Sequence, residues 1–369
     1  MKQYTINSKT KIKLFVDAHV FDGIPQGTVT YLSGLYSELI KDERFILFVG
    51  SNDKSVAVLK LGSTNFIHIQ YKNESRIKRL LYTIPQILKS NEIDYAHFQY
   101  ISPIQKRCKY IVTTHDLLFL EFPESFPLIY RIKNSILFYL SAKRADVVTT
   151  VSQYSKESIH RFFKIPMNKI KLVPNGVKIN HEHPEPFNQL KAIKFILLVS
   201  RIEPRKNQAL LIKIWKELNL YNQEIDLVIV GSEGIRDVNF FRETQDLSDQ
   251  QRIHFHWFEN VTTRNLDWMY QNCYLFVFPS SAEGFGIPPL EAAIHGAKVL
   301  CSNTTAMKDF NFWGHFNFNP NSVEEFKTAL SFALTNKFNH LQAIETIKTK
   351  YNWERIAKDF ANLICKDTR

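Results

Sequence analysis

Short apolar runs separated by longer helical patterns organise the first half of the chain. A run such as residues 12–16, apolar without alternation, predicts a strand that is buried on both faces. The expected strands of this half are residues 12–16, 45–49, 66–69, 110–113, 147–151 and 170–173. Apolar residues recur with helical spacing over residues 30–40, 76–89 and 128–144. Strands alternating with helices predict a parallel sheet covered on both faces.

The stretch from Pro174 to Phe187 is polar and rich in proline, which marks a linker. After it the alternation begins again, with expected strands at 195–199, 227–230, 253–256, 275–278 and 298–301. Helical patterns fall at 208–218, 266–271 and 288–295. The sequence therefore predicts an α/β protein with two Rossmann-like domains, 1–183 and 184–347. Ligands of such sheets bind at the carboxyl ends of the strands, so we expect the site in the cleft between the domains.

Composition limits the class of protein and its partners. A chain of 369 residues with 44% apolar residues suits a globular protein of two domains. Its four cysteines lack C-x-x-C spacing, and neither a signal peptide nor a spanning apolar run is evident, so we expect a cytosolic protein. The net charge of +11 calls for an anionic partner: nucleic acid, anionic lipid or a diphosphate. Residues 71–90 alone carry five basic side chains against Glu74.

The strongest chemical feature is P-S-S-A-E-G-F-G-I-P-P-L-E-A-A, residues 279–293. It follows an expected strand, holds two glycines in a short loop and starts a helix at a proline pair. Glycines let the backbone approach a ligand, and a helix N-terminus attracts anions, so the turn suits a diphosphate. Any strand-to-helix turn of this fold needs small residues, and a glutamate there stabilises the helix end. Two carboxylates, Glu283 and Glu291, together with two prolines favour the functional interpretation.

A second feature, S-R-I-E-P-R-K-N at residues 200–207, follows the expected strand 195–199. It places Arg201, Arg205 and Lys206 at the carboxyl end of a strand. Arginine offers a planar fork to phosphate oxygens and lysine a compact charge. Alone, the segment could be a solvated basic loop. Its presence in the same domain as the glycine turn indicates a diphosphate site.

These motifs resemble those of the family 4 glycosyltransferases, which have the GT-B fold, and the resemblance covers nearly the whole chain. The E-x7-E pattern of the family matches Glu283 and Glu291, and its arginine and lysine match Arg201 and Lys206. The resemblance implies a retaining transferase that takes a sugar from a nucleotide diphosphate. Arg201 and Lys206 would hold the diphosphate, Glu291 the ribose, and Glu283 the donor sugar. Further donor contacts would come from the turn itself: Gly284, Phe285, Gly286 and Ile287.

The first half matches the family less closely. In D-G-I-P-Q-G-T-V-T-Y, Gly27 fits a donor-binding loop, but Val29 and Thr30 stand where glycine and arginine are common. His115, in T-T-H-D-L, would approach the reacting sugar as a catalytic residue beside Arg201, Lys206 and Glu283. Trp257 occupies a position that resembles the nucleotide-base pocket, where it could stack on the base or simply be a core aromatic. Residues 348–369, with Y-N-W-E-R-I-A-K-D-F, resemble the terminal helix that packs back on the first domain.

The sequence shows no Asp-x-Asp pair and no histidine or cysteine spacing typical of a metal site. Together with the resemblance, this predicts a metal-independent reaction without a cofactor. The expected partners are a nucleotide diphosphate sugar, with a slight preference for GDP-mannose, and a glycan or lipid-linked acceptor of bacterial surface polysaccharide synthesis. The segment 76–89 predicts peripheral contact with anionic lipid at the inner face of the cell membrane, although Pro85 would kink its helix. Its apolar positions, which could instead belong to the core, are Ile77, Leu80, Leu81, Ile84, Ile87 and Leu88. Two alternatives stay open. One is an epimerase or phosphorylase on the same fold, and the other is a nucleic-acid-binding protein, although no nucleic-acid motif is present.

Overall fold

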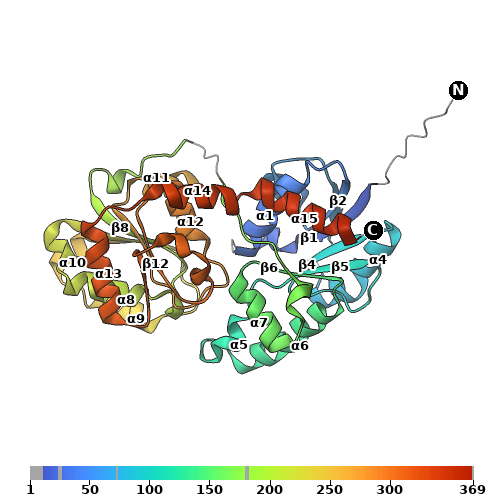
Figure 1. The fold of residues 1–369 in the computed structure, drawn as a ribbon, viewed down its shortest axis with the longest axis horizontal. Coiled ribbons are helices and arrows are strands. Elements are labelled where there is room, and N and C mark those ends of the chain that lie inside the picture. Colours follow the sequence, from blue (N-terminus) through green and yellow to red (C-terminus); the bar gives the residue numbers. More distant parts are fainter. Residues whose placement is uncertain (1–10, 24–26, 72–73, 179–182, 368–369) are drawn as a thin grey trace. The chain divides into compact units, whose positions relative to one another are not determined.

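The computed structural model describes residues 11–23, 27–71, 74–178 and 183–367. The chain forms two compact units (Figure 1). Unit 1 comprises Met1–Gly176 and Trp353–Arg369, and unit 2 comprises Val177–Asn352. The sequence placed these boundaries after residues 183 and 347, and part of the expected linker, residues 179–182, lies outside the described residues.

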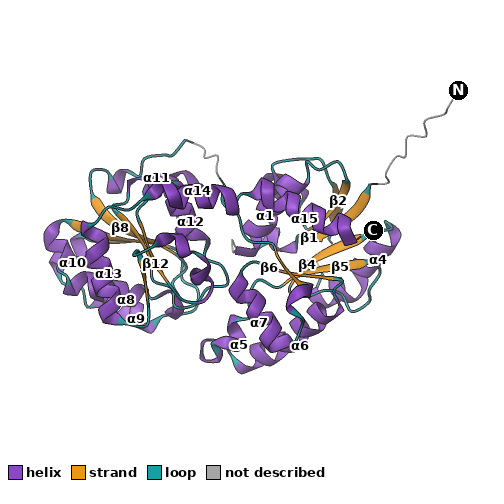
Figure 2. Cartoon of the chain, in the orientation of Figure 1, coloured by secondary structure: helices purple, strands orange, loops and turns teal. Residues whose placement is uncertain are grey.

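Unit 1 is built on a parallel seven-stranded sheet in the order β3-β2-β1-β4-β5-β6-β7 (Figure 2). Its strands are β1 (Ile12–Asp17), β2 (Phe45–Ser51), β3 (Ile67–Gln70), β4 (Tyr95–Gln99), β5 (Lys109–Thr113), β6 (Val147–Thr150) and β7 (Ile170–Leu172). The predicted strands are all present. The apolar pattern does not reveal β4, the central strand, because polar His97 and Gln99 interrupt a segment that is buried throughout.

The helices of unit 1 cover both faces of this sheet (Figure 2). They are α1 (Gly27–Leu39), α2 (Lys54–Leu61), α3 (Arg76–Lys78), α4 (Ile84–Ser90), α5 (Leu118–Glu121), α6 (Leu128–Arg144), α7 (Gln153–Phe163) and α15 (Trp353–Asp367), with the 3-10 turns η1 (His19–Asp22), η3 (Pro123–Ser125) and η4 (Met167–Lys169). The last helix, α15, packs along α1 (Figure 1). Trp353, the first residue of α15, packs against two glycines, and a Cβ on either Gly34 or Gly176 would overlap its ring. The C-terminal segment thus completes unit 1.

The segment 76–89 is helical but interrupted close to Pro85, where the sequence predicted a kink. The π-helical turn η2 (Arg79–Thr83) separates α3 from α4 and ends two residues before Pro85. A proline removes one helical hydrogen bond and crowds the preceding turn, and a wider turn relieves both effects. Ile84 and Leu88 are buried in the core of unit 1. These two side chains therefore belong to the core, the alternative that the sequence left open, and are not available to lipid.

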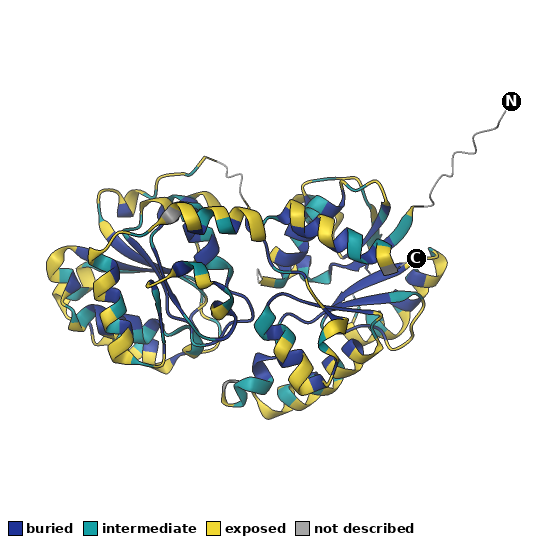
Figure 3. Ribbon diagram, viewed as in Figure 1, coloured by how far each residue is buried: buried dark blue, intermediate teal, exposed yellow. Residues whose placement is uncertain are grey.

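Unit 2 has a parallel six-stranded sheet in the order β10-β9-β8-β11-β12-β13. Its strands are β8 (Lys194–Val199), β9 (Ile225–Val230), β10 (Phe255–Phe258), β11 (Leu275–Phe278), β12 (Val299–Ser302) and β13 (Asn317–Phe318). Its helices are α8 (Gln208–Glu217), α9 (Val238–Gln245), α10 (Asp249–Ile253), α11 (Thr263–Asn272), α12 (Ile287–Ile294), α13 (Val323–Thr335) and α14 (His340–Lys350), with the 3-10 turns η5 (Asn188–Leu190), η6 (Pro204–Lys206), η7 (Leu220–Gln223), η8 (Thr305–Asp309) and η9 (Asn311–Trp313). Figure 3 shows the inner strands of both sheets as the buried layer of each unit, whereas the edge strands β3, β7 and β10 are partly exposed. Each sheet therefore lies at the centre of a separate core.

Strand order in unit 2 brings the two sequence motifs together. β8 and β11 are neighbours and run parallel, so the loops that follow them leave the same edge of the sheet. The Ser281 amide donates to the Arg205 carbonyl over 2.8 Å, which joins the two loops directly. Within the described residues, no helix has the length and apolarity needed to cross a membrane.

Candidate active site

A buried carboxylate between two cations forms the centre of the candidate site in unit 2. Lys206 Nζ donates to Glu283 Oε1, and Arg205 Nη1 lies 3.2 Å from Glu283 Oε2. The same Arg205 nitrogen donates to the Ala282 carbonyl over 2.7 Å. Both cations come from η6, and Glu283 comes from the loop after β11. The segment 200–207 and the glycine turn therefore meet through charged side chains.

The protonation of this cluster follows from its burial. The Lys206 side chain is only 11% exposed, and burial lowers the pKa of its ammonium despite the attraction of Glu283. Burial opposes the ionisation of Glu283 as well, but the charges of Lys206 and Arg205 outweigh it and hold the pKa of that carboxyl below its usual value. Glu283 is thus an anion within the site, and it partly neutralises the cations that an anionic ligand would meet.

Arg201 lies at the edge of this cluster, and its role toward a diphosphate stays a prediction. Its side chain is half exposed, and its Nε lies 3.8 Å from Glu203 Oε1. Glu203 in turn binds Arg205, with Nη2 and Oε2 2.8 Å apart. Lys206 is thus brought to Glu283, whereas Arg201 reaches the cluster through Glu203. Arg205, which the sequence analysis noted only as part of the basic loop, makes the second contact with Glu283.

The glycine turn between β11 and α12 has a backbone that only glycine adopts easily at one position. Gly286 has φ = 91°, and a Cβ there would also overlap the Met307 side chain. Thr305 Oγ1 accepts from the Glu283 amide over 2.9 Å, which holds the loop from the opposite side. Helix α12 then starts at Ile287, with prolines in its first turn. Prolines have no N–H, so the amides of Gly286 and Ile287 are the donors that this turn could offer a phosphate.

Glu291 lies half-buried on α12 and accepts from the Tyr270 hydroxyl of α11, with the oxygens 3.1 Å apart. Burial raises the pKa of Glu291, the hydrogen bond from Tyr270 partly offsets this effect, and the nearby charge of Asp267 adds to it, so that the pKa lies at about 7. A carboxyl with this pKa changes charge near neutral pH. It could therefore respond to a ligand that binds only its ionised form.

Trp257 on β10 has well-defined packing partners. Its indole N–H donates to the Gly231 carbonyl over 2.9 Å, and the ring packs edge-on against Phe240 and Phe241 of α9. These contacts provide the core role that the sequence analysis allowed for this residue. They fix the ring at the carboxyl side of the sheet, and its stacking on a base stays a prediction.

His115 belongs to unit 1, where it ends a chain of buried polar groups. Its Nε2 lies 2.7 Å from Gln99 Oε1, and the Gln99 amide nitrogen lies 3.2 Å from His97 Nε2. Tyr36 closes the chain, with its hydroxyl 2.8 Å from His97 Nδ1. Burial lowers the pKa of His115 to about 3, so the ring is neutral at physiological pH. The Gln99 oxygen must accept from His115, which fixes the tautomer with a proton on Nε2.

Gly27, the other predicted site residue of unit 1, is the exposed first residue of α1. A Cβ there would meet open space, so its surroundings do not require glycine. The residues directly before it, 24–26, lie outside the described residues.

The sequence analysis missed residues that position the site. Tyr270 and Thr305 belong to no motif, because each acts through one hydrogen bond from a neighbouring element. Arg205 was named in the basic loop but not assigned to the site, although it lies one residue before Lys206 at the same strand end. Gln99 was hidden with the missed strand β4.

Comparisons with known proteins cover almost the whole described chain. The family model "Glycosyltransferase Family 4" matches residues 26–181, and "Glycosyl transferases group 1" matches residues 181–353. The serotype-specific mannosyltransferase WbdA of Escherichia coli is 31% identical over 231 residues, 58% of this chain and 28% of that protein. The O-antigen chain mannosyltransferase RfbU of Salmonella typhimurium is 28% identical over 220 residues, 59% of each chain. The chain thus spans less than two thirds of either relative.

A solved structure supports the same assignment at the level of the fold. The sucrose-phosphate synthase of Thermosynechococcus elongatus superposes with a TM-score of 0.76 at 16% identity, over 96% of this chain and 98% of that one. The architecture agrees with the family matches. The chain has two parallel sheets, its terminal helix α15 belongs to unit 1, and the two family models match consecutive stretches of the chain. The chain belongs to the family 4 glycosyltransferases and has their GT-B fold.

Proposed function

We propose that this chain transfers a hexose or deoxyhexose from a nucleotide diphosphate sugar to a lipid-linked or oligosaccharide acceptor in bacterial surface polysaccharide synthesis. The observation that carries the proposal is the buried cluster of Lys206, Arg205 and Glu283 at two neighbouring strand ends. Two relatives are named as mannosyltransferases, one of them of the O-antigen chain, which supports a mannose donor.

The proposed chemistry uses preorganised charge. The acceptor hydroxyl attacks the anomeric carbon from the face that the diphosphate leaves, so configuration is retained, and a phosphate oxygen takes the acceptor proton. Lys206 and Arg201 stabilise the negative charge of the leaving diphosphate, with Arg205 as a third cation beside them. On donor binding, Lys206 exchanges part of its contact with Glu283 for phosphate oxygens. Glu283 then faces the sugar hydroxyls, and Gly284, Phe285, Gly286 and Ile287 line the turn beside them.

The remaining predicted residues take binding roles in this proposal. Ionised Glu291 accepts hydrogen bonds from the two ribose hydroxyls, and Trp257 lies toward the base. His115 acts near the donor sugar as a fixed neutral imidazole, because a group with a pKa of about 3 is not converted to the imidazolium at neutral pH and therefore does not serve as a general acid. The cations of the site replace a metal ion in neutralising the diphosphate. Activity then needs no divalent cation.

Thermal unfolding against a panel of nucleotide sugars tests the donor first, because a ligand that binds only the folded state raises the melting temperature. We expect GDP-mannose to stabilise the protein more than the uridine donors do. Release of nucleoside diphosphate is then measured with and without a glycan acceptor, in the presence of EDTA. NMR of the product reports its anomeric configuration. Release that requires magnesium, an inverted product, or epimerised donor without acceptor would each contradict the corresponding part of the proposal.

A lipid-linked acceptor also requires access to a membrane. We propose that the protein works at the cytoplasmic face of the cell membrane, held there by peripheral contacts with anionic lipid. The excess of lysine and arginine over acidic residues in the first half of the chain supports this location.

A further inference from the structure

Helix α6 in unit 1 exposes an unusual number of large apolar side chains. Seven of those that are exposed among the described residues lie on this helix: Leu128, Ile129, Tyr130, Ile132, Ile136, Tyr139 and Leu140. Ile129 is 82% exposed. A helix on the surface of a globular protein normally presents polar side chains to water. Exposed apolar clusters of this kind mark interaction surfaces.

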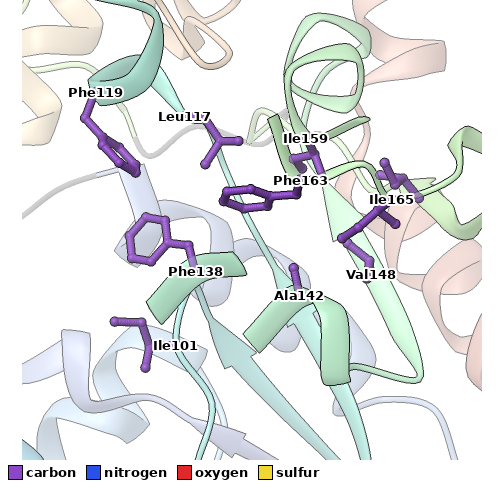
Figure 4. Close-up of a cluster of buried hydrophobic side chains, with 10 residues drawn as sticks. Ile101, Leu117, Phe119, Phe138, Ala142, Val148, Ile159, Phe163 and Ile165 are labelled. Carbon is purple, nitrogen blue, oxygen red and sulfur yellow. The ribbon is translucent and has the colours of Figure 1, made fainter. Parts of the chain in front are cut away.

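The helix is apolar on two opposite sides. Its inner side places Phe138 and Ala142 in a buried cluster with residues of α5 and α7, including Phe119 and Ile159 (Figure 4). At 100° per residue, Ile129, Ile132, Ile136 and Leu140 fall within one sector on the side away from that cluster. The core therefore does not account for this outer stripe, which has the i, i+3, i+7, i+11 spacing of a second binding face.

The charges of α6 indicate the partner. The helix has no acidic residue, and its basic side chains are Arg131, Lys133, Lys143 and Arg144. At its C-terminal end Arg144 donates to the carbonyl of Ile104, itself an exposed apolar residue, and Lys106 Nζ donates to the Arg144 carbonyl over 3.3 Å. Apolar side chains flanked by lysine and arginine, on a helix without carboxylates, complement a surface that is apolar in its interior and negatively charged at its boundary with water. An anionic lipid bilayer has this chemistry.

The neighbouring segment α3–η2 adds to this surface in part. Leu80 packs onto the same buried cluster as Phe138, and the charge of Arg76 acts on the pKa of Tyr130 of α6, so this segment lies near α6. Ile77 and Leu81 stay exposed on it, close to Arg76 and Lys78 in the sequence. The segment that the sequence singled out for lipid therefore borders the larger apolar face rather than forming it.

We propose that α6 is the membrane-docking helix of this protein, which lies in the plane of an anionic bilayer and inserts its outer apolar stripe. The proposal deepens the peripheral location proposed above, but it concerns a surface of unit 1 far in sequence from the donor-binding residues of unit 2. Lys133, Lys143 and Arg144 contact lipid phosphates, while Ile129, Ile132 and Ile136 enter the acyl boundary. Binding therefore needs neither donor nor acceptor.

Vesicle flotation of the full chain tests this directly, with phosphatidylcholine vesicles that contain or lack phosphatidylglycerol. The double variant Ile129→Gln, Ile136→Gln removes two inserted side chains, and its matched control, Val238→Gln, Ile253→Gln, removes two exposed apolar side chains from unit 2. The double variant Lys133→Glu, Lys143→Glu reverses two charges on α6. Its control, Lys348→Glu, Lys350→Glu, makes the same net charge change on exposed residues of α14. Because all these positions are exposed, melting temperatures should stay close to that of the wild type.

The wild type should float with the anionic vesicles at low salt and dissociate as salt is added. Each α6 variant should lower the partition coefficient by at least about tenfold, because burying one isoleucine side chain or attracting one lysine contributes on that scale. Both controls should stay within about twofold of the wild type. Absence of wild-type binding, or equal binding of the α6 variants and their controls, would overturn the proposal. So would sedimentation showing that the isoleucine variant only dissociates a dimer. None of these outcomes depends on sugar transfer, which is measured separately with a soluble acceptor.

Discussion

At the scale of single residues, the site combines groups whose charges depend on each other. A buried carboxylate such as Glu283 stays ionised only because Lys206 and Arg205 surround it. Removing one partner of such a pair leaves an uncompensated charge, which costs far more than the pair itself contributes. The same arrangement holds both cations in place before an anionic ligand arrives. Preorganised charge of this kind does not have to be rearranged during the reaction.

Replacing Lys206 tests this arrangement. We expect Lys206→Ala to lower kcat by roughly 10²-fold or more, since a preorganised contact to the leaving diphosphate is lost. Lys213→Ala, a solvent-facing lysine of α8, is the matched control and should keep the wild-type rate. Rates measured at saturating donor separate this effect from weaker binding. A Lys206→Ala enzyme with unchanged kcat would show that the cluster only stabilises the fold.

Glu291 gives a prediction that depends on pH. Its pKa of about 7 lies above the ordinary 4.5, so the folded protein keeps a proton that the unfolded chain loses between these values. The stability of the free protein therefore falls as pH rises through this window. Glu291→Gln carries no ionisable group, so we expect it to melt higher than the wild type above pH 7, with a difference that shrinks toward pH 4.5. Thermal unfolding across this range measures the difference.

The same substitution should have the opposite effect on the nucleotide. If ionised Glu291 holds the ribose, Glu291→Gln should weaken nucleoside diphosphate binding by at least about tenfold. The loss should grow from about pH 6 to about pH 8, as the wild-type carboxyl ionises. Comparing the two proteins at each pH cancels the ionisation of the phosphate itself. Calorimetric titration that gives equal affinities would leave Glu291 a purely structural residue.

At the scale of elements, apolar patterning predicted most strands and several helices, including α6 with its bounds. It failed where polar residues are buried. β4 carries His97 and Gln99, whose partners Tyr36 and His115 lie at least 16 residues away in the sequence. Local patterning cannot show that such groups will be satisfied. At residues 76–89 the apolar helix pattern left open which side chains the core takes, and the structure assigns Ile84 and Leu88 to it.

The turn before α12 is the element that can be tested most directly. Gly286→Ala places a Cβ at a strained φ and against Met307, so we expect a loss of roughly 1–3 kcal/mol in unfolding free energy and weaker donor binding. Shortening the clashing side chain in Gly286→Ala, Met307→Ala should relieve the overlap but not the backbone strain. Chemical unfolding of the wild type, both single variants and the double variant separates the two causes. Additive losses in the double variant would mean that the overlap contributes nothing.

At the scale of the whole molecule, the sequence predicted two α/β domains and a terminal helix that returns to the first, and unit 1 contains that helix. The boundaries could not be placed as closely. The chain leaves unit 1 after Gly176 and returns at Trp353. The Trp353 ring fits there because Gly34 and Gly176 have no side chains. A glycine that makes room for a ring from a distant segment has no local signature. Only the assembled unit shows why α15 belongs to it.

The contribution of α15 to unit 1 leads to a prediction about the molecule as two separate cores. Phe360 is almost fully buried on α15, with its ring 5.3 Å from that of His97 in β4. Phe360→Ala should cost about 3–5 kcal/mol, as large cavities in a core do. Because the donor-binding cluster lies in unit 2, nucleoside diphosphate affinity should stay within about twofold of the wild type at temperatures where unit 1 is folded. Hydrogen exchange should show faster opening of β1, β4 and α1, with β8 and β11 unchanged. Equal loss of protection in both sheets would show instead that the two cores unfold as one cooperative unit.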